Sequence, residues 1–164
     1  DPDRLAIAGH SYGAYLTAVA VTQTTRFKAA LFSDGMVNLV GDDLDLPDFE
    51  EYYSYHFGGT FEERRRALLK RSPIMALNRV RTPVLVRAGN LRSGHRTFGK
   101  LSQARQLYTG LRVNNVPSML IIHNYEGHGI GDPMTYRDYT RRNLAWLDYF
   151  VLGRGVDPMT AEAE

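Results

Sequence analysis

Cysteine is absent from the 164-residue sequence, which excludes disulfides and thiolate metal sites. No run reaches the roughly 18 consecutive apolar residues of a membrane-spanning helix, and the N-terminus lacks a signal-peptide pattern, so no membrane partner is expected. The 20 basic and 18 acidic residues nearly cancel, which gives no basic patch of the kind that binds nucleic acid. No histidine pair has zinc-protease spacing and no glycine-rich phosphate loop occurs, so neither a metal nor a cofactor is expected.

The sequence does contain a serine at an abrupt change of backbone pattern. The motif Gly9-His10-Ser11-Tyr12-Gly13 follows a short apolar run at 4–8 and precedes an alanine-rich, helix-permissive run at 12–23. This G-x-S-x-G pattern between a strand and a helix predicts a nucleophile elbow, which exposes Ser11 at a strained turn. The N–H of Tyr12, at the positive end of the helix, is then the first donor to an oxyanion. The alternative is that Ser11 is only the N-cap of that helix.

Strands and helices alternate along the rest of the chain. Further strands are predicted at 27–32, 82–89 and 116–123, and further helices at 49–57, 61–71, 101–111 and 136–152. This alternation predicts an α/β fold with a mainly parallel sheet and helices on both faces. One domain is expected over residues 1–152, followed by a polar, disordered tail at 153–164.

Charged stretches are interpreted as solvent-exposed. Residues 36–48 contain several aspartates and are predicted to be a solvated loop, in preference to a calcium loop, because the spacing of calcium ligands is missing. The basic residues within 61–71 are likewise expected to form a solvated helix face.

Candidate catalytic residues follow the predicted strands. Because functional groups gather at the carboxyl ends of parallel strands, Ser11, Asp34, the 90–97 loop and His128 are expected to meet at one edge of the sheet. A serine hydroxyl needs a neighbouring imidazole to remove its proton, and the glycines beside His128 free its loop to present the ring. His128 is therefore the predicted base. A surface or packing role is favoured for the other histidines, His10, His56, His95 and His123.

Several motifs accompany the elbow: Phe57-Gly58-Gly59, Arg71-Ser72-Pro73-Ile74, Thr82-Pro83-Val84-Leu85 and Glu126-Gly127-His128-Gly129. Together they resemble the catalytic domain of the prolyl oligopeptidase family of serine peptidases. The resemblance implies the C-terminal portion of an α/β-hydrolase fold, with a missing N-terminal part of the same protein that includes a propeller domain. It also implies cleavage of peptide or acyl-peptide bonds through an acyl-enzyme on Ser11, with a peptide as substrate. Tyr52, Tyr53 and His56 would then lie near the pocket for the residue before the scissile bond, whereas simple packing of this aromatic face is the alternative.

The same resemblance implies a catalytic acid in the loop after the third predicted strand, yet residues 89–95 contain no carboxylate. Asp34 directly follows the strand next to the elbow strand, and it is the candidate for orienting His128 instead. The alternative is that Asp34 is a turn residue. Three functions remain open: a serine peptidase, an esterase of the same fold, and a non-catalytic relative that acts as a binding module.

Overall fold

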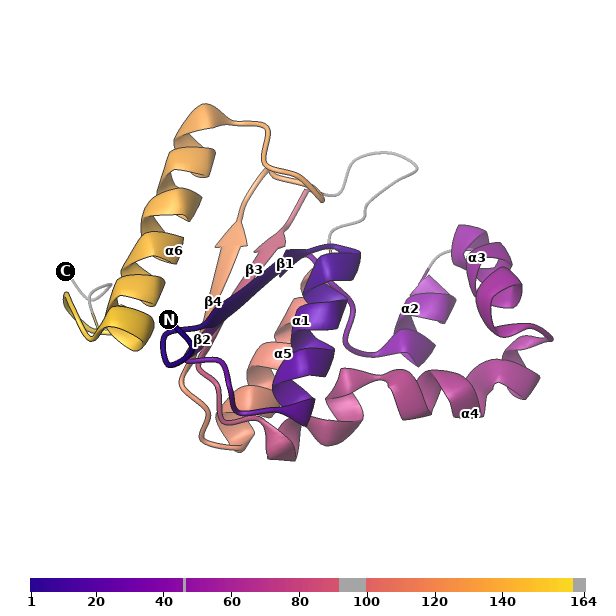
Figure 1. The fold of residues 1–164 in the computed structure, drawn as a ribbon. Coiled ribbons are helices and arrows are strands. Elements are labelled where there is room, and N and C mark those ends of the chain that lie inside the picture. Colours follow the sequence, from indigo (N-terminus) through magenta and orange to yellow (C-terminus); the bar gives the residue numbers. More distant parts are fainter. Residues whose placement is uncertain (46, 92–99, 161–164) are drawn as a thin grey trace.

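The structure, a computed structural model, describes residues 1–45, 47–91 and 100–160. Its strands form one four-stranded sheet in the order β1-β2-β3-β4, and every neighbouring pair is parallel (Figure 1). The strands are β1 (Ala6–His10), β2 (Ala29–Ser33), β3 (Val84–Gly89) and β4 (Ser118–His123). The predicted α/β fold with a parallel sheet is confirmed, and each strand lies within about two residues of its predicted position.

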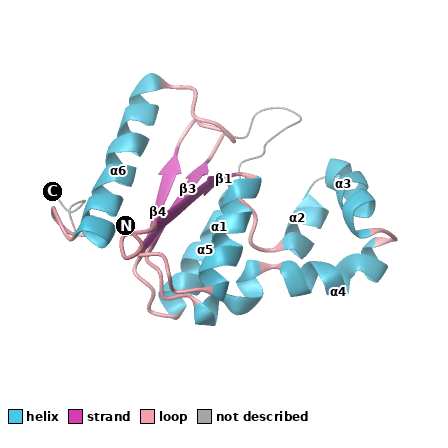
Figure 2. Cartoon of the chain, in the orientation of Figure 1, coloured by secondary structure: helices cyan, strands magenta, loops and turns pink. Residues whose placement is uncertain are grey.

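Helices cover both faces of the sheet (Figure 2). One face packs against α1 (Tyr12–Gln23), α5 (Leu101–Val113) and the short 3₁₀ helix η1 (Pro73–Arg79), while α6 (Pro133–Leu152) covers the other. Side chains alternate between the two faces along each strand. Phe32 and Val86 therefore join the core under α1 and α5, whereas Leu31 and Leu85 pack against Trp146 of α6.

Three helices stand beside the sheet: α2 (Leu39–Asp45), α3 (Pro47–Phe57) and α4 (Phe61–Arg71) (Figure 1). The prediction of a solvated loop at 36–48 is therefore wrong, since α2 and the start of α3 lie there. Asp42 forms an ion pair with Lys100, and Asp43 accepts two hydrogen bonds from Arg64 at 2.9 and 3.0 Å. Arg64 itself was expected to be solvated and is buried. Ion pairs with residues distant in the chain thus neutralise charges that were expected, from the sequence, to be exposed to solvent.

The chain continues in contact with the core beyond α6. Gly153 adopts a left-handed conformation with φ of 64°, and the N–H of Arg154 donates to the Asp148 carbonyl at 2.9 Å, which ends the helix in a Schellman-type turn. Met159 then packs against the cluster around Trp146. The sequence predicts a disordered tail from residue 153, whereas Met159 packs against the core. Residues 161–164 lie outside the described residues.

Candidate active site

Ser11 occupies a strained turn between β1 and α1. Its φ of 59° and ψ of −122° lie in a region that residues with a side chain rarely adopt. The Ser11 N–H donates to the Ser33 carbonyl at 2.9 Å, and the Ser11 carbonyl accepts from the N–H of Ala14 at 3.0 Å and of Tyr15 at 3.2 Å. Ser11 occupies the N-cap position of α1, but its side chain makes no capping hydrogen bond to the helix. Backbone bonds hold the turn, and the hydroxyl is not used by the helix end.

Two glycines let the helix approach the strand this closely. A methyl group on Gly9 would lie 2.1 Å from the Gly13 carbonyl oxygen, and one on Gly35 would lie 2.5 Å from the Ala14 methyl carbon. Nothing lies within 4 Å of the equivalent position on Gly13. The motif glycine at position 9 is therefore sterically required, whereas Gly13 is not. Gly35 contributes to the elbow from the neighbouring loop, which the G-x-S-x-G pattern does not reveal.

Ser11 and His128 line the same cavity, of about 270 Å³. Its remaining lining residues are Tyr12, Met36, Asp42, Tyr52 and Lys100. As the first residue of α1, Tyr12 has no intrahelical acceptor for its N–H, which fits the predicted oxyanion donor. The structure thus brings together the predicted nucleophile, base and first oxyanion donor, although more than a hundred residues separate Ser11 from His128 in the chain.

The loop that bears His128 is tied down on both sides. Before His128, the Leu91 N–H donates to the Glu126 carbonyl at 2.7 Å. After it, the Glu126 carboxylate accepts from the N–H of Gly131 at 2.8 Å and of Asp132 at 2.9 Å. These backbone hydrogen bonds hold the pKa of Glu126 below its usual value. Glu126 closes the loop around His128, a role that its place in the sequence motif does not reveal.

The ring of His10 lies against the ring of His128. Their centroids are 4.7 Å apart, and Nδ1 of His10 lies 3.3 Å from Oγ of Ser33. Burial lowers the pKa of His10, and the neighbouring His128 and Arg87 lower it further, so His10 is neutral at pH 7. The sequence favoured a surface or packing role for His10 and did not predict that it packs against His128.

Asp34 ends β2 in a left-handed conformation, with φ of 48°, and is fully buried. One carboxylate oxygen accepts from the Gly89 N–H at 3.0 Å, and the other forms an ion pair with Arg87, which is buried as well. Burial raises the pKa of Asp34 to about 6, against the opposing effects of Arg87 and the Gly89 N–H. The oxygens thus engage Arg87 and Gly89, and a role for Asp34 in orienting His128 stays a prediction.

Two other predicted elements have different outcomes. His123, for which packing was favoured, is buried at the end of β4, where its Nδ1 accepts from Nε of Arg87 at 3.2 Å. The loop expected to hold the family's acid lies largely at 92–99, outside the described residues, as does His95.

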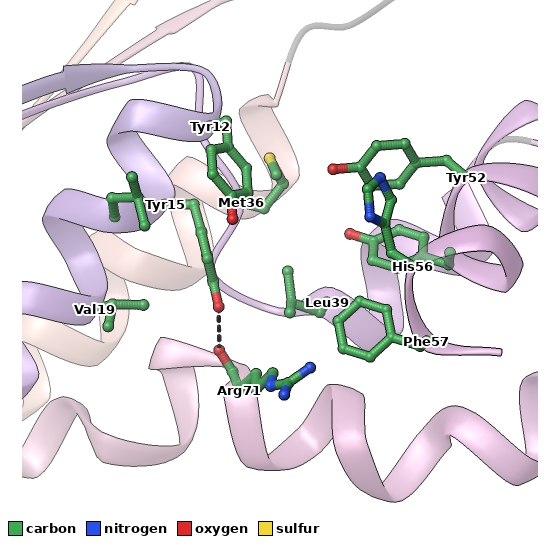
Figure 3. Close-up of a pocket in the computed structure, with 11 residues that line it drawn as sticks. Tyr12, Tyr15, Val19, Met36, Leu39, Tyr52, His56, Phe57 and Arg71 are labelled. Carbon is green, nitrogen blue, oxygen red and sulfur yellow. Dashed lines mark hydrogen bonds between the residues drawn. The ribbon is translucent and has the colours of Figure 1, made fainter.

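A second pocket, of about 560 Å³, adjoins the first (Figure 3). Tyr12, Met36 and Tyr52 line both spaces. In Figure 3, Tyr52 and His56 of α3 face α1 across the pocket. The centroid of the Tyr52 ring lies 4.4 Å from that of the His56 ring. Tyr53 is buried, and its hydroxyl donates to Asp42 at 3.0 Å, so this residue forms part of the wall. All three predicted aromatic residues line the pocket.

Within the described ranges, no group of three or more histidine, aspartate or glutamate side chains could hold a metal ion. In the same ranges, no helix is both long and apolar enough to cross a membrane.

Comparison with known proteins gives consistent matches. The model of the prolyl oligopeptidase family matches residues 1–153. A probable chloroplastic glutamyl endopeptidase of Oryza sativa subsp. japonica is 27% identical over 92% of this chain and 15% of its own length. Dipeptidyl-peptidase 5 of Porphyromonas gingivalis is 28% identical over 92% of this chain and 22% of its own length. A puromycin-hydrolyzing peptidase of Mycobacterium tuberculosis superposes with a TM-score of 0.82 at 29% identity, covering 92% of this chain and 22% of that one. The chain therefore spans about a fifth of the length of these proteins.

Proposed function

Because this chain belongs to the prolyl oligopeptidase family of peptidases and has an α/β-hydrolase fold, we propose that it supplies the nucleophile and the base of a serine peptidase. The observation that supports this most is the position of Ser11, strained at the elbow and facing the same cavity as His128. A strained turn of this kind presents the hydroxyl away from the helix, where a base can reach it.

The proposed reaction has two steps. His128 removes the hydroxyl proton of Ser11 while the oxygen attacks the scissile carbonyl, and the Tyr12 N–H stabilises the oxyanion that forms. His128 then gives the proton to the leaving amine, which departs as an ester forms on Ser11. Water, deprotonated by His128, hydrolyses that ester and restores the serine.

Asp34 is proposed to orient His128 through the backbone. Its carboxylate holds the Gly89 N–H, and Gly89 packs against the carbonyl groups of Glu126 and Gly127, directly before His128. A carboxylate that fixes this contact fixes the direction of the loop. The turn interpretation of Asp34 predicts no such effect on catalysis.

The adjoining aromatic pocket is proposed to bind the side chain that precedes the scissile bond of a peptide substrate. Tyr52 and His56 contact that side chain in this proposal, and the ring of Tyr53 supports them from behind. The greater length of the relatives supports the expectation of a further N-terminal part, such as a propeller domain, in the whole protein.

A fluorophosphonate probe tests the proposal, since it labels only an activated serine. In the protein as it is naturally made, we expect labelling of the wild type, none of Ser11→Ala, and strongly slowed labelling of His128→Ala. Ser54→Ala, on α3 and outside both pockets, is the control and should label like the wild type. Absence of wild-type labelling would favour the non-catalytic binding module. Hydrolysis of p-nitrophenyl esters without that of p-nitroanilides would favour the esterase.

A further inference from the structure

A positively charged side chain lies at the base of the aromatic pocket. Arg71, the last residue of α4, lines the pocket, and Figure 3 shows it below Leu39 and Phe57. Its guanidinium carbon is 5.1 Å from the centroid of the Phe57 ring, and its carbonyl accepts from the Tyr15 hydroxyl at 3.1 Å. The Phe57 ring therefore contacts the Arg71 side chain, and the Tyr15 hydroxyl holds the Arg71 backbone.

Among the side chains that the structure describes, no carboxylate pairs with this charge. Arg71 has no ion pair among them, whereas Arg64 on the same helix is paired with the buried Asp43. None of the described side chains that line the pocket is acidic. Asp42, in the adjoining cavity, is already paired with Lys100. The pocket thus presents a net positive charge to whatever enters it.

Arg71 lies beside α1, the helix that begins at the elbow. Tyr15, to which the Arg71 backbone is bonded, follows Ser11 by four residues, which is about 6 Å along a helix. Burial raises the pKa of Tyr15 and the charge of Arg71 opposes that rise, so the guanidinium acts on the pocket wall itself. A side chain that enters the pocket from the elbow therefore approaches Arg71 along α1.

We propose that this pocket selects an acidic side chain at the residue before the scissile bond, and that Arg71 is the residue that selects it; this rests on the proposed peptidase function. A guanidinium binds a carboxylate through charge-assisted hydrogen bonds, which are stronger than those to a neutral amide. Aromatic walls displace water from the pair and reduce the screening of its charges. A lysine side chain would instead meet a like charge, which adds discrimination by repulsion.

Peptide p-nitroanilides that differ only in glutamate, glutamine, phenylalanine or lysine at this position test the proposal in the naturally made protein. We expect kcat/KM for glutamate to exceed that for glutamine about tenfold or more, with lysine lowest. Arg71→Gln should bring the glutamate-to-glutamine ratio near one. The matched control is Arg65→Gln, an arginine that is exposed on the same helix but is paired with Glu62 and lies outside the pocket. An unchanged ratio in Arg71→Gln would overturn the proposal.

Calorimetric binding of N-acetylglutamate and N-acetylglutamine separates this inference from the proposed function. If no substrate is cleaved and Ser11 is not labelled, the peptidase proposal fails. The pocket is still tested, because wild-type protein should bind the glutamate compound more tightly and Arg71→Gln should bind both equally. Equal binding of the two compounds by the wild type would overturn the selectivity of the pocket.

Discussion

The backbone of Gly89 lies directly against that of Gly127. A methyl group added to Gly89 would be 2.1 Å from the Gly127 carbonyl oxygen and 2.3 Å from that of Glu126. Both atoms are backbone and cannot rotate out of the way. The end of β3 therefore determines the position of the loop that bears His128, which is the residue after Gly127.

Gly89→Ala should accordingly displace His128 and reduce kcat by about 100-fold, the order of loss that a misplacement near 1 Å can cause. KM should change little, because the proposed contacts to the substrate side chain lie on α3 and α4. The control is Gly129→Ala, where nothing lies within 4 Å of the added methyl group. A folded Gly89→Ala protein with wild-type kcat would show that this contact does not position the base.

Glu126→Gln should lower kcat about tenfold, and Glu126→Ala should lower it further. Glutamine retains one acceptor oxygen for the two N–H groups of Gly131 and Asp132, while alanine retains none. Since Glu126 touches no proposed substrate group, KM should stay near its wild-type value. Glu62→Gln, an exposed residue of α4, is the control for loss of a surface carboxylate. Parallel changes in KM and kcat would contradict a role limited to the loop.

Asp34→Ala should abolish most activity and destabilise the fold by about 3–5 kcal/mol, since it leaves the buried Arg87 without its carboxylate. The double variant Asp34→Leu/Arg87→Met separates the two effects, because an apolar pair of similar size restores stability. We expect that double variant to recover part of the lost stability, because the Gly89 N–H and Nδ1 of His123 still lack their partners, and still to have low kcat. Recovery of both properties would identify Asp34 as a structural turn residue.

A carboxylate introduced into the loop after β3 should raise activity, whereas the loss of the Asp34 carboxylate should lower it. Leu91→Asp is expected to raise kcat if the usual acid position is empty, because a carboxylate stabilises the imidazolium that forms during acylation. Leu91→Asn has the same shape without the charge and is the control. Equal rates in the two variants would show that this position does not reach His128.

The histidines also predict how stability depends on pH. Burial, followed by the charge of Arg87, lowers the pKa of His123, and burial lowers that of His10. Below pH 6.5 the unfolded chain takes up protons at these residues that the folded chain does not, so stability present above 6.5 is lost as the pH falls. Asp34, with its pKa raised to about 6, acts in the opposite direction as the pH falls through that value.

Urea unfolding between pH 7.5 and 6 measures this dependence within the window where the histidines dominate. The free energy of unfolding should fall toward pH 6, and His123→Gln should reduce the fall, because glutamine keeps an acceptor for Arg87 without titrating. An identical pH dependence in the variant would mean that His123 titrates alike in both states.

The outer edge of β1 predicts association of the isolated 164-residue chain. Among the described residues β1 pairs only with β2, and Ala6 and Ala8 are exposed. An unpaired apolar strand edge is a template for pairing with another chain. Ala8→Lys should therefore reduce association in sedimentation velocity, and Thr109→Lys on α5 controls for the added charge. A wild-type chain that remains a monomer would contradict this prediction.

Local patterns were sufficient to predict the elbow and the order of strands and helices. The turn at Ser11 is encoded within five residues, and α1 and α4 have their predicted bounds. The failures concern charges whose partners are distant in the chain. Asp43 is 21 residues from Arg64, and Asp42 is 58 residues from Lys100, so no local pattern indicates that either aspartate is buried.

The candidate site shows the same division. That Ser11 and His128 meet in one cavity could be predicted, because the first lies in a distinctive motif and the second in a glycine-bearing loop after a strand. The contact of His10 with His128 could not, because it depends on how two loops meet above the sheet. The partners of Asp34 could not be predicted either, since Arg87 lies within an apolar strand where sequence alone indicates no buried ion pair.

That His128 activates Ser11 is tested most directly by the pre-steady-state burst of p-nitrophenol from a p-nitrophenyl ester. The wild type should release one equivalent per protein, Ser11→Ala none, and His128→Ala should acylate at least about 10³-fold more slowly. A burst that persists in Ser11→Ala, or one that His128→Ala leaves at the wild-type rate, would contradict the assignment of these two residues as nucleophile and base.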